Sequence, residues 1–177
     1  DKVESSMQNA MIFVVDGKLT TTEQAMAILQ PVIKRGKPLL VMAEDISGNA
    51  LSTLLMNKMR GGHNICAIKT PGFGDIRKEM ALDIAAIVGA EVVPSDRVED
   101  VTEEYVEQLF GSANAVKVEQ MSTIIMGGAM NEEKIEQRLA VIEQARNKKG
   151  ITDYVAKQLD LRKAKLGGGV VVIEVGA

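Results

Sequence analysis

Four polar residues are the candidates for catalytic chemistry in this sequence. Glu44 and Asp45 follow an apolar run that predicts a buried strand, and α/β proteins often place catalytic groups at strand ends. Two adjacent carboxylates can transfer protons or hold a metal ion, but no third ligand or base lies nearby in the sequence. His63 is the only histidine, so a site with several histidines is excluded and any catalytic triad depends on it. Asp75 begins a predicted helix. Acidic side chains at such positions are more often solvated surface charges than catalytic groups.

Two further motifs indicate structure rather than chemistry. Cys66 lies inside a short apolar run, where a thiol is usually an inert core group. The stretch Gly72-Phe73-Gly74-Asp75 lacks both the Lys-Ser/Thr pair of a P-loop and a complete Gly-x-Gly-x-x-Gly motif. An aspartate at a helix start repels an anion, so helix capping explains this loop better than phosphate binding. The sequence therefore predicts no catalytic site, no metal site and no cofactor of its own.

The amino-acid composition argues against some classes of binding partner. The chain has 177 residues, of which 46% are hydrophobic and 25% charged, with a formal net charge of −3. This length and this share of hydrophobic residues are enough for one folded domain with a hydrophobic core. An acidic chain with 3% aromatic residues and no tryptophan argues against nucleic-acid binding. The absence of an apolar run of about 20 residues argues against a membrane span. A single cysteine fits a reducing compartment, the cytoplasm or an organelle matrix or stroma.

Apolar runs alternate with helical patterns and predict an α/β domain over residues 14–177, preceded by a linker or frayed segment over 1–13. Thr20 and Glu23 match a capping box, so a helix is expected from residue 20 to Gly36, with a kink or a shortened regular part at Pro31. The predicted strands cover residues 10–15, 38–43, 65–68, 91–93, 115–118, 123–126 and 170–175, and the other predicted helices cover 47–61, 76–88, 102–110, 131–149 and 151–165.

The helices over residues 20–36 and 47–61 have more apolar surface than one buried face requires. In the first, one stripe contains Ala25, Ile28, Leu29 and Val32, and a rotated stripe contains Met26, Leu29 and Ile33; in the second, Leu51, Leu55, Met56 and Met59 widen the face formed by Ala50 and Leu54. We therefore expect one face of each helix to pack on a sheet and the other to line an open groove for apolar segments of other proteins. Complete burial of both helices is the simpler alternative.

Several short segments, in a fixed order, point to one family. They are Gly36-Lys37-Pro38-Leu39-Leu40, Ala43-Glu44-Asp45, Asn57 with Met59-Arg60-Gly61, Lys69, Pro71-Gly72-Phe73-Gly74-Asp75, Asp83-Ile84-Ala85, Thr123-Ile124-Ile125, and Gly168-Gly169-Val170 with Val175-Gly176-Ala177. Each segment is weak evidence alone, but together they are specific. From about Val14 to Ala177 the chain resembles the apical domain of a GroEL-type (group I, 60 kDa) chaperonin.

The resemblance implies a chaperonin apical-domain-like β-sandwich core flanked by α-helices. It also implies a chaperone that assists ATP-dependent protein folding, in which two helices bind non-native polypeptides and the mobile loop of the co-chaperonin lid. By position, the groove residues are Met26, Leu29, Ile33, Leu51, Leu55, Met56 and Asn57. In the intact ring, other chaperonin subunits are partners, and ATP and Mg are cofactors of a separate domain.

The chain also departs from the family pattern. The Gly-Asp-Gly-Thr-Thr ATPase motif is absent, so this chain is expected to hydrolyse no ATP and to be monomeric or weakly associating. The family carries an aromatic segment of the groove before the point where this sequence begins. Two alternatives stay open: a small α/β enzyme domain that uses Glu44, Asp45, His63 and Asp75, and a purely structural domain.

Overall fold

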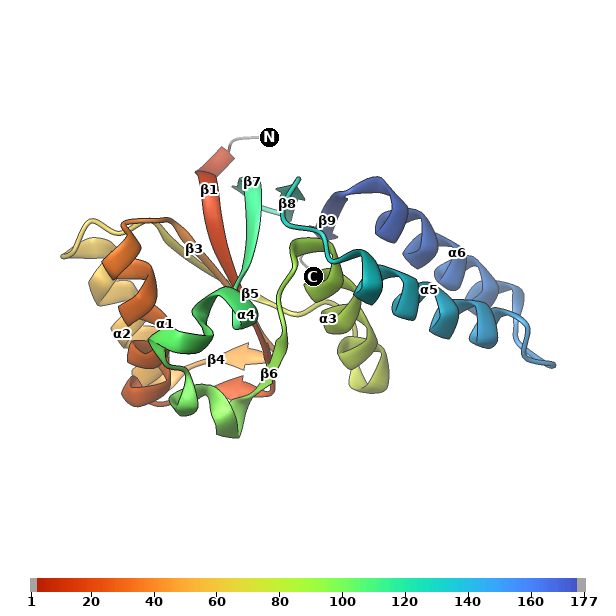
Figure 1. Cartoon of the computed structure of the whole chain (residues 1–177), viewed down its shortest axis with the longest axis horizontal. Coiled ribbons are helices and arrows are strands. Elements are labelled where there is room, and N and C mark those ends of the chain that lie inside the picture. Colours follow the sequence, from red (N-terminus) through yellow and green to blue (C-terminus); the bar gives the residue numbers. More distant parts are fainter. Residues whose placement is uncertain (1–2, 175–177) are drawn as a thin grey trace.

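The structure, a computed structural model, describes residues 3–174 and has a mixed α/β fold, which confirms the predicted class (Figure 1). Seven strands form the main sheet in the order β5-β3-β1-β7-β8-β9, with β6 paired to the end of β1. A separate two-stranded sheet joins β2 (Lys18–Leu19) to β4 (Asp45–Ile46). The seven strands are β1 (Val3–Asp16), β3 (Leu39–Ala43), β5 (Ile65–Lys69), β6 (Val92–Pro94), β7 (Gly111–Glu119), β8 (Ser122–Met126) and β9 (Val170–Glu174).

Strand β1 lies at the centre of the sheet and joins its two halves. It pairs in parallel with β3 and β6, and antiparallel with β7. The predicted linker over residues 1–13 is therefore wrong from Val3 onward, while residues 1 and 2 lie outside the described part. The polar residues Ser5, Ser6 and Gln8 give this segment the composition of a linker. It is nevertheless a strand, in which Met7 is buried and lies opposite Val116. Pairing with β7, a partner more than 100 residues away in sequence, stabilises this segment.

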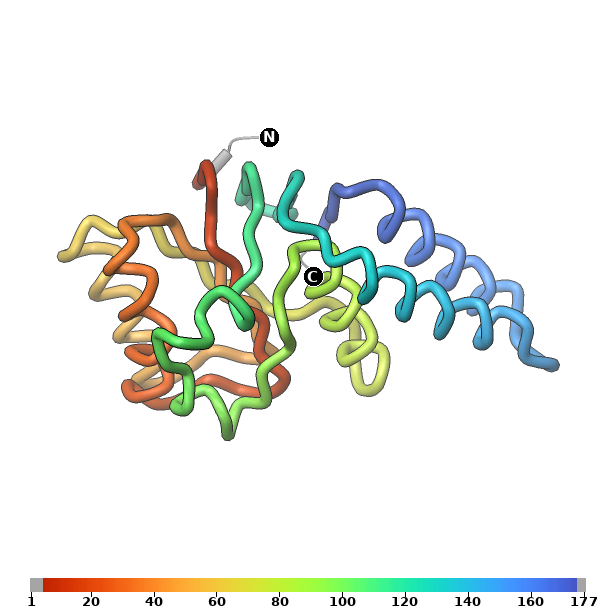
Figure 2. Tube along the Cα trace, viewed as in Figure 1, coloured from red at the N-terminus to blue at the C-terminus, as the bar shows by residue number. Residues whose placement is uncertain are grey.

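The sheet has a hydrophobic core on each face. Ile12 and Val14 face one core, and Phe13 and Val15 face the other. This burial on both faces explains why the predicted strands over residues 10–15 and 38–43 appear as continuous apolar runs. Helices α1 (Thr22–Arg35) and α2 (Gly48–Met59) cover one face, and α3 (Gly74–Val88), α5 (Glu132–Arg146) and α6 (Asp153–Gly168) pack on the other (Figure 2).

Helix α1 differs in detail from its prediction. Its capping box is formed by Thr21 and Gln24, one residue later than expected: the Gln24 N–H donates to Thr21 Oγ1, and the Thr21 N–H donates to Gln24 Oε1, both at 3.1 Å. Gly36 ends the helix in the left-handed conformation with φ 65°, as expected. The expected shortening at Pro31 is wrong, because the helix continues to Arg35 and Pro31 is itself buried in the core.

The region after β6 is less regular than expected. Residues 95–109 form two 3-10 turns, η1 (Ser95–Asp100) and η2 (Glu103–Tyr105), and one turn of helix, α4 (Val106–Leu109), where a single short helix was predicted over 102–110. Strands β7 and β8, both predicted, pair antiparallel. Helix α6 runs through Gly168, beyond its predicted end at residue 165, and Gly169 ends it in the left-handed conformation with φ 70°.

A network of four charged side chains attaches the α5–α6 hairpin to α3. Both carboxylate oxygens of Asp83 are engaged, with Arg138 Nε 2.8 Å from Oδ1 and Arg162 Nε 2.7 Å from Oδ2. Glu79 pairs with the same two guanidinium groups. Burial alone lowers the pKa of Arg138, but its hydrogen bonds with Asp83 and Glu79 outweigh burial and raise it. Figure 1 shows the hairpin extending away from the sheet. The network attaches it to α3 together with buried apolar side chains of α5 and α6, namely Ile135, Ile142, Leu159 and Leu166.

Candidate functional site

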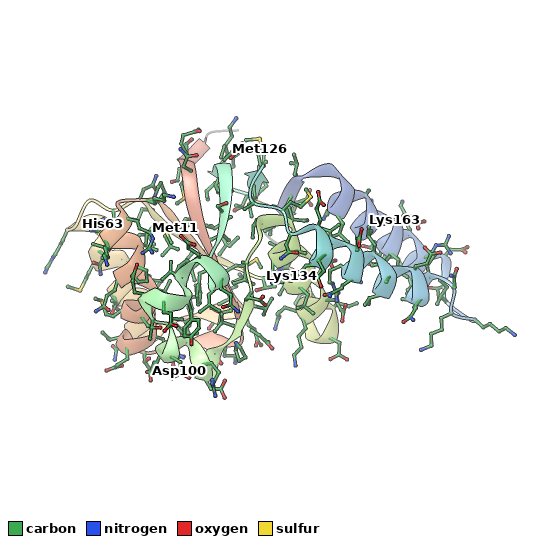
Figure 3. All side chains as sticks on the ribbon, viewed as in Figure 1. Met11, His63, Asp100, Met126, Lys134 and Lys163 are labelled. Atoms are coloured by element: carbon green, nitrogen blue, oxygen red, sulfur yellow. The ribbon has the colours of Figure 1, made fainter. Side chains whose placement is uncertain are left out.

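The structure does not assemble the candidate catalytic residues. Strands β3 and β5 are parallel, and Leu39 is opposite Ile65. His63 precedes β5 whereas Glu44 follows β3, so these two residues lie at opposite ends of the sheet. In Figure 3, His63 lies beyond the end of α2, at the periphery of the molecule.

The two carboxylates and Asp75 have other neighbours. Glu44 Oε1 lies 2.8 Å from Arg77 Nη1 in α3, and Asp45 Oδ1 lies 3.5 Å from Lys69 Nζ. Asp75 is exposed in the first turn of α3. Within residues 3–174, no three His, Cys, Asp or Glu side chains are grouped closely enough to hold a metal ion. No helix of this described part is long and apolar enough to cross a bilayer.

Sequence reasoning missed one buried polar group at the carboxyl ends of the parallel strands. Thr70 follows β5 and is almost fully buried, and its Oγ1 has no hydrogen-bond partner among the described residues. Thr70 is one of the residues that line a cavity of about 10 Å³, together with Asp16, Glu44, Arg77 and Lys78. A cavity of this size has room for at most one water molecule. Burying a hydroxyl without a partner costs roughly 1–3 kcal/mol.

Replacing Thr70 with Val is expected to raise the free energy of unfolding by about 1 kcal/mol, because a methyl group of the same shape removes the buried unpaired hydroxyl. Urea denaturation followed by circular dichroism measures this change. Thr70→Ser is the control, because it keeps the hydroxyl and loses only the methyl group, and it is expected to destabilise. A lower stability of Thr70→Val would contradict the prediction and place a water molecule on the hydroxyl.

Helices α1 and α2 lie side by side, with their N-terminal ends joined. The Ala50 N–H donates to Thr20 O at 3.2 Å, and the Thr53 hydroxyl lies 3.3 Å from the Thr22 hydroxyl. Both helices connect strands of the parallel half of the sheet, so they run in the same direction. The two helices are therefore parallel neighbours on one face of the sheet.

Helix α2 leaves most of its apolar surface exposed. Only Ala50 and Leu54, one turn apart, are buried against the core. The other large apolar side chains form what we call the α2 ridge: Leu51 (36% exposed), Leu55 (46%), Met56 (50%) and Met59 (81%). Helical spacing explains the division, because Leu51 and Leu55 lie one position beyond the two buried residues and recur on successive turns.

The structure separates the predicted groove residues into two groups. Leu51, Leu55 and Met56 are exposed, and Asn57 lies at the edge with its side-chain amide donating to Thr53 O at 2.8 Å. On α1, Met26 and Ile33 are half-buried and pack against the core.

Leu29 does not line an exposed surface, because its side chain is 0% exposed. The prediction that Leu29 belongs to an open groove is therefore wrong. The residue lies four positions after Ala25 and three before Val32, both buried, so it falls on the face that packs on the sheet. Conversely, Met59 is the most exposed member of the ridge, and the predicted groove omitted it.

The α2 ridge exposes four large apolar side chains to solvent on one helix. Leucine and methionine have no groups that activate a substrate, but they release water readily when another apolar chain covers them. Methionine is unbranched and polarizable, so it adapts to partners of different shape. No protein-family model matches the chain.

Proposed function

We propose that this chain is the polypeptide-binding apical domain of a group I chaperonin. In this proposal, the α2 ridge captures apolar segments of non-native polypeptides and the mobile loop of a co-chaperonin. The observation that carries it is the exposure of Leu51, Leu55 and Met56 on one helix, at the positions where the family resemblance implies a groove. The main sheet with helices on both of its faces supports an apical-domain-like mixed α/β fold.

The binding mechanism is burial of apolar surface. A bound segment places its side chains over Leu51, Leu55 and Met56, and the half-buried Met26 and Ile33 of the neighbouring α1 extend the contact. Each Leu-sized side chain that becomes buried contributes roughly 1.5–3 kcal/mol. Two or three such contacts exceed the cost of association only slightly. A single domain therefore binds weakly and with little selectivity.

In the proposed intact protein, a ring of subunits strengthens this weak binding. Several ridges at one cavity mouth hold one polypeptide at several points, so dissociation from one ridge does not release it. ATP and Mg act in a separate domain of that protein and reorient the apical domain. The proposed compartment is the cytoplasm or an organelle matrix or stroma, as expected for such a chaperonin.

Replacing Leu55 with Glu is expected to weaken peptide binding by more than tenfold while leaving the fold intact. The introduced carboxylate must lose its water when an apolar segment covers it, but at 46% exposure it stays hydrated in the free protein. Fluorescence anisotropy of a labelled apolar peptide, similar in sequence to a co-chaperonin loop, measures binding, and circular dichroism measures folding.

Leu82→Glu is the matched control for this experiment. Leu82 is 40% exposed on α3, which packs on the opposite face of the sheet, so the same substitution there is expected to leave binding unchanged. If Leu55→Glu binds the peptide as well as the wild type does, the ridge is not the binding surface. If the wild type binds no peptide, the purely structural alternative is favoured.

A further inference from the structure

One end of the α2 ridge carries positive charge. Lys58 lies three residues after Leu55, and Arg60 lies four residues after Met56. At these spacings a helical side chain lies one turn beyond its neighbour, on the same side. Both cationic side chains are exposed, and neither forms an ion pair within the described residues. The apolar surface is therefore continuous with two uncompensated positive charges at the C-terminal end of α2.

The cations at the end of α1 differ, because both already lie beside an acidic side chain. Glu103 Oε1 lies 2.5 Å from Arg35 Nη2 and 4.0 Å from Lys34 Nζ. The hydrogen bond from Arg35 lowers the pKa of Glu103, so this carboxylate stays charged at neutral pH. Lys58 and Arg60 have no comparable partner in the described part of the chain. They therefore remain available to a bound molecule.

The opposite end of α2 carries no charged side chain of its own, although Glu23 lies in the first turn of the adjoining α1. The first turn of α2 contains no acidic residue, and the ridge there begins with Leu51 beside the polar residues Asn49 and Ser52. The helix dipole places only about half a negative charge at the C-terminal end, less than the two positive charges of Lys58 and Arg60. The whole chain has a net charge of −3, so this positive region is local to one end of the ridge.

We propose that the ridge prefers apolar segments followed or preceded directly by acidic residues, with the acidic end bound at Lys58 and Arg60. This inference rests on the proposed function and specifies the class of polypeptide. The apolar side chains provide the contact area, and the acidic pair fixes which end of the segment lies at the end of α2. Charges at the rim of an interface act mainly on specificity and on the rate of association. Because these charges are exposed, salt screens them.

The test compares labelled peptides that share one apolar core. One carries Gln-Gln at both ends, and two others replace the first or the last pair with Glu-Glu. At low salt, we expect one of the two acidic peptides to bind about three- to tenfold more tightly than the Gln peptide. The preference should disappear at about 0.5 M salt and in the double variant Lys58→Gln/Arg60→Gln.

The control variant is Lys157→Gln/Lys163→Gln, which removes two exposed charges from α6. Figure 3 shows Lys163 on the projecting hairpin, far from His63 at the end of α2. We expect this variant to keep the preference for the acidic peptide. Equal binding of the acidic and Gln peptides by the wild type would overturn the charge preference but leave the proposed function standing, because both peptides would still bind.

A second control separates this preference from simple ion exchange. A Glu-rich peptide without the apolar core, and an oligothymidylate of similar charge, are added as competitors. We expect neither to displace the acidic apolar peptide at equal concentration. Displacement by either competitor would overturn the inference, because charge alone would then account for binding. Failure of every peptide to bind would instead contradict the proposed function itself.

Discussion

Replacing Asp83 with Ala is expected to lower the free energy of unfolding by about 3–5 kcal/mol. The carboxylate of Asp83 is 9% exposed and pairs with Arg138 and Arg162, whose side chains are 11% and 12% exposed. Removing it leaves two nearly buried guanidinium groups with only Glu79 as a shared partner. Two positive charges then remain together in a poorly solvated place. Urea denaturation followed by circular dichroism measures the loss.

The exposed pair between Arg146 and Asp160 is the matched control. It joins the same two helices, α5 and α6, with Nε 3.2 Å from Oδ1, but its side chains are 44% and 59% exposed. Asp160→Ala is therefore expected to cost at most about 1 kcal/mol. Equal costs for the two substitutions would contradict a special role for the Asp83 network. Hydrogen exchange adds a second readout, because amides of α5 and α6 should lose protection in Asp83→Ala.

No local pattern predicts this network. Arg138 and Arg162 belong to helices with many charges, and such charges usually face water. Their partner Asp83 is 55 residues before Arg138 and 79 before Arg162. The network exists because the hairpin packs on α3, and nothing in the sequence shows that α3 is its partner. Sequence therefore identifies the helices but not the contact that holds them.

The strands also fall into two groups: those that the local sequence predicts, and those that form only through pairing with a distant segment. Strands β3 and β5 were predictable, because each is a short apolar run between turn signals, although only β3 is buried on both faces. The first half of β1 was not predictable, because Ser5, Ser6 and Gln8 resemble a polar linker. Its strand conformation depends on hydrogen bonds with β7. A segment of this kind adopts its conformation only through its tertiary partner.

The candidate site was predictable on α2 and only partly on α1. On α2, Ala50 and Leu54 are buried and the remaining apolar residues are exposed, as two separate stripes predict. On α1, Leu29 belongs to both predicted stripes. Helical spacing places a residue on a face, but it does not say which face packs on the sheet. The sheet decides this, and it buries Leu29.

Replacing Leu29 with Ala is expected to lower the free energy of unfolding by about 2–5 kcal/mol, because truncation of a fully buried leucine removes apolar contacts and leaves a cavity. Leu55→Ala is its matched partner on the neighbouring helix. At 46% exposure, Leu55 should lose less than about 1 kcal/mol of stability, while peptide affinity falls. Urea denaturation measures the loss of stability expected for Leu29→Ala, and peptide anisotropy measures the loss of affinity expected for Leu55→Ala. If Leu29→Ala kept full stability and lost peptide binding, Leu29 would belong to the open groove.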